Sequence, residues 1–162
     1  MKIEIFNETE YDISNDLKLQ LKTYMREVAK ILEQPTNFEI CLNFVKQDEI
    51  KRLNKEMRNK DSVTDVLSFP ALDIKPGEKL DLPKFEFEKN IETKSFYLGD
   101  MAICCDVAQS QAQEFDETFE EEVCRLFVHS LLHLFGYDHI EDLDFAVMNK
   151  FEKLVLKDKY KD

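Results

Sequence analysis

The segment LFVHSLLHLF, residues 126–135, is apolar on every side of the helix that its pattern predicts. Such a helix has no polar face to offer to water, so the rest of the chain must cover it all round. Thr118 and Glu121 form a capping-box signature, which predicts that the helix begins there. Gly136 supplies the left-handed residue that ends it near Phe135. The remaining elements must therefore be arranged around this central helix.

The spacing of apolar residues predicts both strands and helices along the rest of the chain. Alternating apolar residues predict strands, and apolar residues three to four positions apart predict helices. We expect strands over residues 2–6, 38–45, 65–70 and 96–105, helices over 15–34, 48–57 and 106–115, and a last helix that contains Leu143, Val147, Phe151 and Leu154. Residues 71–96 mix turn residues with one short alternating piece, and we treat them as an excursion that can hold a hairpin.

This order of elements predicts the fold class. Strands and helices alternate early in the chain, and helices cluster late. We expect a single α+β domain over residues 1–162, with one mixed sheet of four to five strands. Helices pack with this sheet around the buried, histidine-bearing helix.

Charge and hydropathy exclude two classes of partner. The formal net charge of −12 argues against a broad nucleic-acid-binding face, and no DNA partner is expected. No apolar run approaches the ~18 residues that a membrane span needs, so no membrane partner is expected either. The charge is uneven, however, because residues 46–60 carry six basic residues against three acidic ones. Since salt screens charges over ~10 Å, this stretch can attract phosphate locally, although a solvated helix face is the simpler interpretation of the run alone.

The cysteines indicate a reducing compartment. The chain contains Cys41, Cys104, Cys105 and Cys124, with no C-x-x-C pair and with two of the four adjacent. Adjacent cysteines bridge poorly because the bond would be strained. We therefore expect reduced, buried thiols in a cytoplasmic protein.

All three histidines of the chain lie in HSLLHLFGYDH, residues 129–139. His129 and His133 project from one face of the helix, and the turn at Gly136 lets His139 approach the same point. Three imidazoles leave one open position on a tetrahedral zinc ion, which is typical of a catalytic site. The alternative is core histidines satisfied by protein partners, but each ring buried without a partner costs ~1–3 kcal/mol. The pattern therefore favours one zinc ion per chain.

The spacing of these histidines and Gly136 also matches the H-E-x-x-H-x-x-G-x-x-H pattern of metzincin peptidases. In those enzymes the glutamate after the first histidine is the general base, and this chain has Ser130 there. A hydroxyl group lacks the basicity of a carboxylate at neutral pH. A zinc metallopeptidase therefore stays an alternative that needs a base from elsewhere.

The same stretch resembles the hallmark H-G-x-L-H-L-x-G-Y-D-H of the YbeY family of bacterial metallo-endoribonucleases. Three further segments resemble blocks of that family, so the likeness covers nearly the whole chain: LNKEMRNKDSVTDVLSFP, LGDMAICCDVAQSQAQE and DLDFAVMNKFEKLV. The chain departs from the family at Ser130, where glycine is usual, and in the long excursion between Pro70 and Leu98. Because Ser130 is small, we expect close packing around the helix to survive.

The resemblance implies a function and partners. It implies that His129, His133 and His139 bind zinc and that the protein cleaves single-stranded RNA in 16S rRNA 3′-end maturation and ribosome quality control. The implied partners are the rRNA precursor and the small ribosomal subunit with its assembly factors. A non-catalytic ribosome assembly factor with a structural zinc ion is the second alternative.

The resemblance also carries the family's functional arginine onto Arg58. A guanidinium can bind two phosphoryl oxygens at once and stabilise charge that develops in the transition state. Among the aspartates, Asp100 and Asp138 are candidates for orienting a histidine, and Asp65 is a candidate for positioning water. Ordinary capping or turn roles are the alternative for all three.

Overall fold

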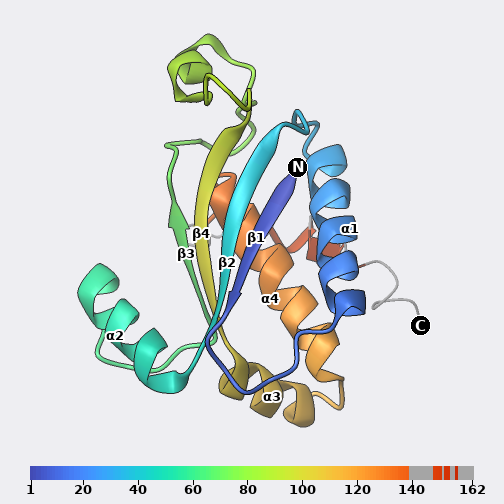
Figure 1. The fold of residues 1–162 in the computed structure, drawn as a ribbon, viewed down its shortest axis with the longest axis vertical. Helices are drawn as coiled ribbons and strands as arrows, with labels where there is room; N and C mark the ends of the chain where they lie inside the picture. Colours follow the sequence, from blue (N-terminus) through green and yellow to red (C-terminus); the bar gives the residue numbers. More distant parts are fainter. Residues whose placement is uncertain (139–147, 151, 154–155, 157–162) are drawn as a thin grey trace.

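Four strands form the sheet that supports the fold: β1 (Lys2–Asn7), β2 (Phe38–Val45), β3 (Val66–Pro70) and β4 (Phe96–Cys104). The computed structural model describes residues 1–138, 148–150, 152–153 and 156 of the chain. The strand order is β1-β2-β4-β3 (Figure 1). β1, β2 and β4 are parallel, and β3 is antiparallel to β4, so the sheet is mixed as predicted.

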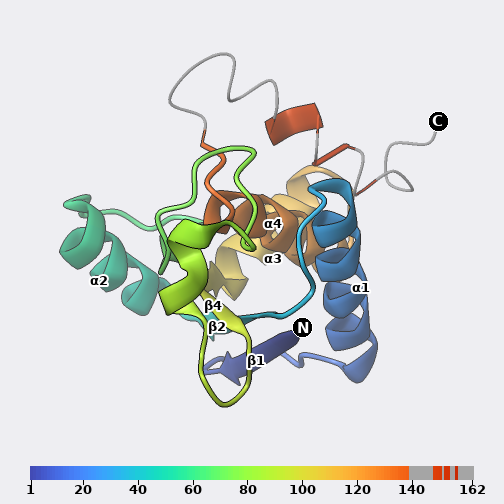
Figure 2. The ribbon, with the colours of Figure 1, turned by 90° about the horizontal axis from the view of Figure 1, so that it is seen from above.

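The described residues also include four α-helices: α1 (Asn15–Ile31), α2 (Gln47–Arg58), α3 (Cys105–Glu114) and α4 (Phe119–Leu134). Figure 2 shows α1, α3 and α4 on one side of the sheet, with α2 apart from them. α1 packs beside α4, and α4 also contacts α3, β3 and β4. The predicted α+β architecture is therefore confirmed. None of these described helices is long and apolar enough to span a bilayer.

The central position of α4 follows from its sequence. The Thr118 hydroxyl accepts from the main-chain N–H of Glu121 at 3.1 Å, and the Glu121 carboxylate accepts from the N–H of Thr118 at 2.8 Å. This capping box satisfies two N–H groups that the first turn leaves without helical partners. Beyond it, the helix buries residues on all sides, including the consecutive Leu126, Phe127 and Val128. The prediction of a capped, covered helix is confirmed.

Alternation along the strands separates two apolar clusters. In β2, Phe38, Ile40, Leu42 and Phe44 face the main core beneath α1 and α4, as their period-two spacing predicts. The opposite face of the sheet contributes to a smaller cluster with α2, built on Val45, Ile50, Leu67, Ala102 and Cys104. α2 therefore has its own apolar anchorage, which places its C-terminal end beside β3.

The excursion differs from the expected hairpin. It contains a 3₁₀ helix, η1 (Pro83–Glu88), and a single antiparallel bridge between Lys89 and Phe96. It rises beyond the start of β4, at the top of Figure 1. Phe85 is 3% exposed, whereas Phe87 is 94% exposed. The alternating phenylalanines thus do not form one row of a strand, because Phe85 packs in the main core and Phe87 does not.

Two other expectations concern the C-terminal segment and the cysteines. The expected last helix falls mostly outside the described residues, of which 148–150 and 152–153 are helical. The four cysteines all lie within the described residues and remain thiols, with no disulfide among them, as predicted. Cys41, however, is only partly buried. Its place in β2 alternates with the core residues, so its side chain points to the other face of the sheet.

Candidate metal and phosphate site

His129 and His133 lie one turn apart near the C-terminal end of α4, as their spacing predicts. Their ring centroids are 4.7 Å apart with an interplanar angle of 79°. The two Nε2 atoms face each other at 3.1 Å. The structure thus brings together two of the three predicted ligands, and His139 lies outside the described residues.

Both Nδ1 atoms make hydrogen bonds that hold the rings. Nδ1 of His129 lies 2.5 Å from Oε1 of Glu152, and Nδ1 of His133 lies 2.7 Å from the main-chain oxygen of Tyr137. A carboxylate and a carbonyl oxygen can only accept, so each Nδ1 donates. Each neutral ring therefore keeps its lone pair on Nε2.

This donor pair fits a zinc ion. Two lone pairs that face each other at 3.1 Å need a cation or a proton between them. Nitrogen ligands about 2.0–2.1 Å from a tetrahedral zinc ion are about 3.4 Å from each other, which is close to that separation. A hydrogen bond from the second ring nitrogen to a carboxylate or carbonyl is also usual for zinc-binding histidines. Within the described residues, which exclude His139, no group of three candidate ligands occurs.

Arg58 faces the same cavity as His133. It is the last residue of α2, which ends because Asn59 adopts the left-handed conformation with φ 57°. Nη2 of Arg58 donates to the main-chain oxygen of Ser68 at 2.8 Å. Arg58 and His133 both line a cavity of about 230 Å³, together with Asp138. Residues from two distant helices therefore meet at one concave surface.

The basic stretch of α2 does not act as a uniform patch. Arg52 donates to the carboxylates of Glu49 at 2.6 Å and Glu56 at 2.7 Å, so its charge is compensated on the helix surface. In the part of the chain that the structure describes, no carboxylate pairs with Arg58. Arg58 therefore lines the histidine cavity with a guanidinium whose charge is available to an anionic ligand.

A close backbone contact shapes the other wall of the cavity. Gly136 follows α4 with φ 95°, and its N–H donates to the carbonyl oxygen of His133 at 2.9 Å. A Cβ atom at this position would lie 2.0 Å from the carbonyl oxygen of Ile74. The start of the excursion therefore packs directly on the turn that follows the histidine helix, which only glycine permits.

The Ser130 side chain points toward β3. Its Oγ lies 2.7 Å from Oγ of Ser68, and both side chains are buried. The close packing that we expected around this small residue is present. Because its hydroxyl is already paired inside the protein, Ser130 is unsuited to the role of general base.

The three candidate aspartates lie in different places. Asp138 lines the histidine cavity. Asp65 accepts from the side-chain amide of Gln111 at 3.3 Å. Asp100 lines a separate cavity of about 310 Å³ with Phe69. Asp100 does not orient His129 or His133, because alternation along β4 turns its side chain toward the smaller apolar cluster rather than toward α4.

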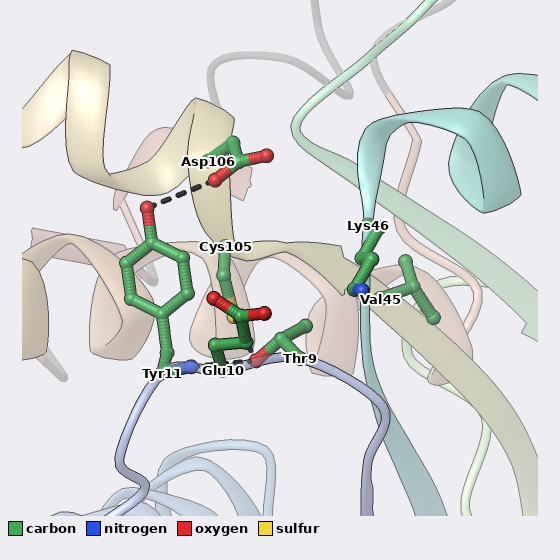
Figure 3. Close-up of a pocket in the computed structure, with 7 residues that line it drawn as sticks. All are labelled: Thr9, Glu10, Tyr11, Val45, Lys46, Cys105 and Asp106. Atoms are coloured by element: carbon green, nitrogen blue, oxygen red, sulfur yellow. Dashed lines mark hydrogen bonds between the residues drawn. The ribbon is translucent and has the colours of Figure 1, made fainter.

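Figure 3 shows a further cavity, of about 170 Å³, where β1 and β2 end and α3 begins. The Tyr11 hydroxyl donates to Asp106 at 3.0 Å across it, and Glu10 and Lys46 also line it. Burial raises the pKa of the Cys105 thiol there to about 11, so this thiol stays protonated and unreactive at neutral pH. The described residues on its wall include two carboxylates and no histidine, so this cavity is a poorer candidate for phosphate chemistry.

The sequence analysis missed two groups that hold the histidines. The Tyr137 carbonyl has no side-chain signal, because any residue supplies one. Glu152 follows Phe151 on the expected last helix, and an acidic residue beside an apolar stripe is an ordinary surface pattern. Only its position in three dimensions distinguishes it.

Comparison with known proteins places the chain in a family. Residues 4–159 match the sequence profile of the family described as Endoribonuclease YbeY. A relative of that name from Finegoldia magna is 39% identical over 159 residues, which cover 98% of this chain and 94% of the relative. Another from Caldicellulosiruptor saccharolyticus is 38% identical over 158 residues, with coverage of 97% and 96%.

A solved structure supports the fold. The solution structure of TM1509 from Thermotoga maritima superposes with a TM-score of 0.56 at 28% sequence identity. The match covers 96% of this chain and 90% of that protein. The two chains therefore share one fold over nearly their whole lengths.

Proposed function

The chain belongs to the YbeY endoribonuclease family, and on that premise we propose that it is a zinc-dependent endoribonuclease acting on single-stranded RNA. The observation that carries the proposal is the cavity shared by Arg58 and His133. In the cytoplasm, the enzyme acts in 16S rRNA 3′-end maturation and ribosome quality control. Its partners are the rRNA precursor and the small ribosomal subunit with its assembly factors.

The chain's own residues divide the work at this site. His129, His133 and His139 would hold a zinc ion, which when bound supplies a Lewis acid for the scissile phosphate. The Tyr137 carbonyl keeps the His133 ring oriented with Nε2 toward His129. These contacts hold the described ligands in place before substrate arrives.

Arg58 is the residue that we assign to the phosphate. Its hydrogen bond to the Ser68 oxygen fixes one side of the guanidinium and leaves other N–H groups for a ligand in the cavity. Hydrogen bonds from a guanidinium to phosphoryl oxygens strengthen as negative charge develops, so they stabilise the transition state more than the bound substrate. Because the cavity is concave, an unpaired backbone enters it more easily than a duplex.

Two other functions compete with this proposal. A zinc peptidase has Asp138 in its favour, because this carboxylate lines the cavity and can supply the base that Ser130 cannot. The cation of Arg58 on the same wall favours an anionic phosphodiester instead. A ribosome assembly factor with a structural zinc ion would need no open cavity with a cation beside the histidines.

One comparison of substrates distinguishes the three. The zinc-loaded protein is incubated with a single-stranded RNA and, separately, with casein, and the RNA ends are mapped. We expect zinc-dependent RNA fragments and intact casein. A 2′,3′-cyclic phosphate end would identify attack by the RNA 2′-hydroxyl. Casein cleavage with intact RNA would establish the peptidase, and no cleavage of either would favour the assembly factor.

A further inference from the structure

The carboxylate of Glu152 reaches a predicted metal ligand from a distant part of the chain. Its Oε1 lies 2.5 Å from Nδ1 of His129, and both side chains are largely buried, with exposed fractions of 14% and 21%. Glu152 belongs to the described part of the C-terminal segment, whereas His129 belongs to α4. The contact therefore joins the two segments at the candidate site.

The two described histidines are held by different means. The Tyr137 carbonyl that accepts from His133 belongs to the turn directly after α4, so helix termination itself supplies it. The carboxylate that accepts from Nδ1 of His129 comes instead from a residue 23 positions further along the chain. The orientation of the His129 ring thus depends on the position of Glu152 in the C-terminal segment.

The charges around Glu152 hold its carboxylate in this place. Arg125 lies one turn before His129 on α4, and its guanidinium donates to the buried carboxylate of Glu122. Burial lowers the pKa of Arg125, but the bond to Glu122 and the nearby charges of Asp65 and Glu152 outweigh it and raise that pKa. A permanently charged guanidinium therefore attracts the same carboxylate that accepts from His129.

We propose that Glu152 is a positioning residue that fixes His129 as the tautomer with a hydrogen on Nδ1 and a lone pair on Nε2. This role rests on the proposed function, because the lone pair matters only if the histidines bind a metal ion. Without an acceptor at Nδ1, a neutral imidazole is free to carry its hydrogen on Nε2, where it blocks metal binding. Losing such an outer partner typically lowers metal affinity by about 10–100-fold.

The test compares Glu152→Ala, Glu152→Gln and the parent, with Lys153→Ala as a control at an exposed position on the same segment. The first readout is the ring ¹⁵N spectrum of the metal-free protein at about pH 8, which reports the ring nitrogens that carry hydrogen; three histidines keep it assignable. The second is zinc affinity by competition with a chelator.

We expect Nδ1–H on His129 in the parent, in Lys153→Ala and in Glu152→Gln, whose amide oxygen still accepts. Glu152→Ala should shift the hydrogen toward Nε2 and lower zinc affinity by about 10–100-fold. An unchanged tautomer in Glu152→Ala would overturn the proposal, even if affinity fell. Failure of the proposed function would look different, because the parent would bind zinc and leave RNA intact while the tautomer readout stayed as stated.

Discussion

The side chains of Ser68 and Ser130 share a buried hydrogen bond in which their Oγ atoms lie 2.7 Å apart. Ser68 belongs to β3, and its main-chain oxygen accepts from Arg58. Ser130 belongs to α4 and follows His129 directly. The bond therefore joins the strand that holds the arginine to the helix that holds the histidines.

A double-mutant cycle measures this connection. Ser68→Ala and Ser130→Ala should each lower the free energy of unfolding by ~1–3 kcal/mol, because each leaves the other buried hydroxyl unpaired. The double variant should lose less than the sum of the two, with a coupling of about 1 kcal/mol by urea denaturation. Ser110→Ala, at an exposed position of α3, serves as the control. Strict additivity of the two losses would show that the bond contributes nothing.

Alanine substitutions at two glycines with similar backbone conformations distinguish the cost of backbone strain from the cost of a steric clash. Gly77 has φ 88° and open space where a Cβ atom would lie, whereas a Cβ on Gly136 would lie 2.0 Å from the Ile74 oxygen. Gly77→Ala should lower stability by only ~1–2 kcal/mol, the usual strain of a left-handed residue. Gly136→Ala should cost more than ~4 kcal/mol, because the excursion must also move. Equal losses on thermal unfolding would contradict the close contact.

Arg58→Ala should leave zinc content and folding intact while lowering the RNA cleavage rate by ~10²–10³, the scale for one lost transition-state donor. Arg58→Lys should remain well below the parent, because an ammonium group lacks the two-pronged geometry. Arg52→Ala is the matched control on the same helix, since Glu49 and Glu56 already occupy that guanidinium. All rates are measured at one salt concentration. Parental cleavage by Arg58→Ala would refute the phosphate role.

The buried thiol of Cys105 predicts a loss of stability in alkali. Burial raises its pKa from an ordinary 9.0 to about 11 in the folded chain. Between these values the unfolded chain releases the thiol proton and the folded chain retains it, so the free energy of unfolding falls as pH rises, by about 2.7 kcal/mol in total. The stability difference between the parent and Cys105→Ala should therefore shrink from about pH 8.5 to about pH 11. A difference that stays constant with pH would contradict this prediction.

Local signals explain why α4 was predictable. Thr118 and Glu121 indicate where the helix begins, and Gly136 indicates where it ends. Helical geometry alone puts His129 and His133 on one face. Each of these inferences needs only residues that are close in sequence. The period-two spacing of apolar residues predicted β2 correctly for the same reason.

Contacts between distant segments had no such signal. The meeting of Arg58 with His133 depends on where α2 ends relative to β3, and the residues of the basic stretch alone suggested only a solvated face. The Ser68–Ser130 bond and the reach of Glu152 depend likewise on tertiary packing. The excursion suggested a hairpin because its alternating phenylalanines resemble a strand in sequence, although Phe85 is buried and Phe87 is exposed.

Titration of the metal-free protein with zinc, with the RNA cleavage rate measured at each point, tests most directly whether the histidine cavity is the catalytic centre. The cleavage rate should rise from background and reach its plateau at one zinc ion per chain. His133→Ala should show neither the tight binding nor the rise, because it removes one of two nitrogens that face each other at 3.1 Å. Cleavage at the full rate by the metal-free parent, or by His133→Ala, would contradict a zinc-dependent histidine site.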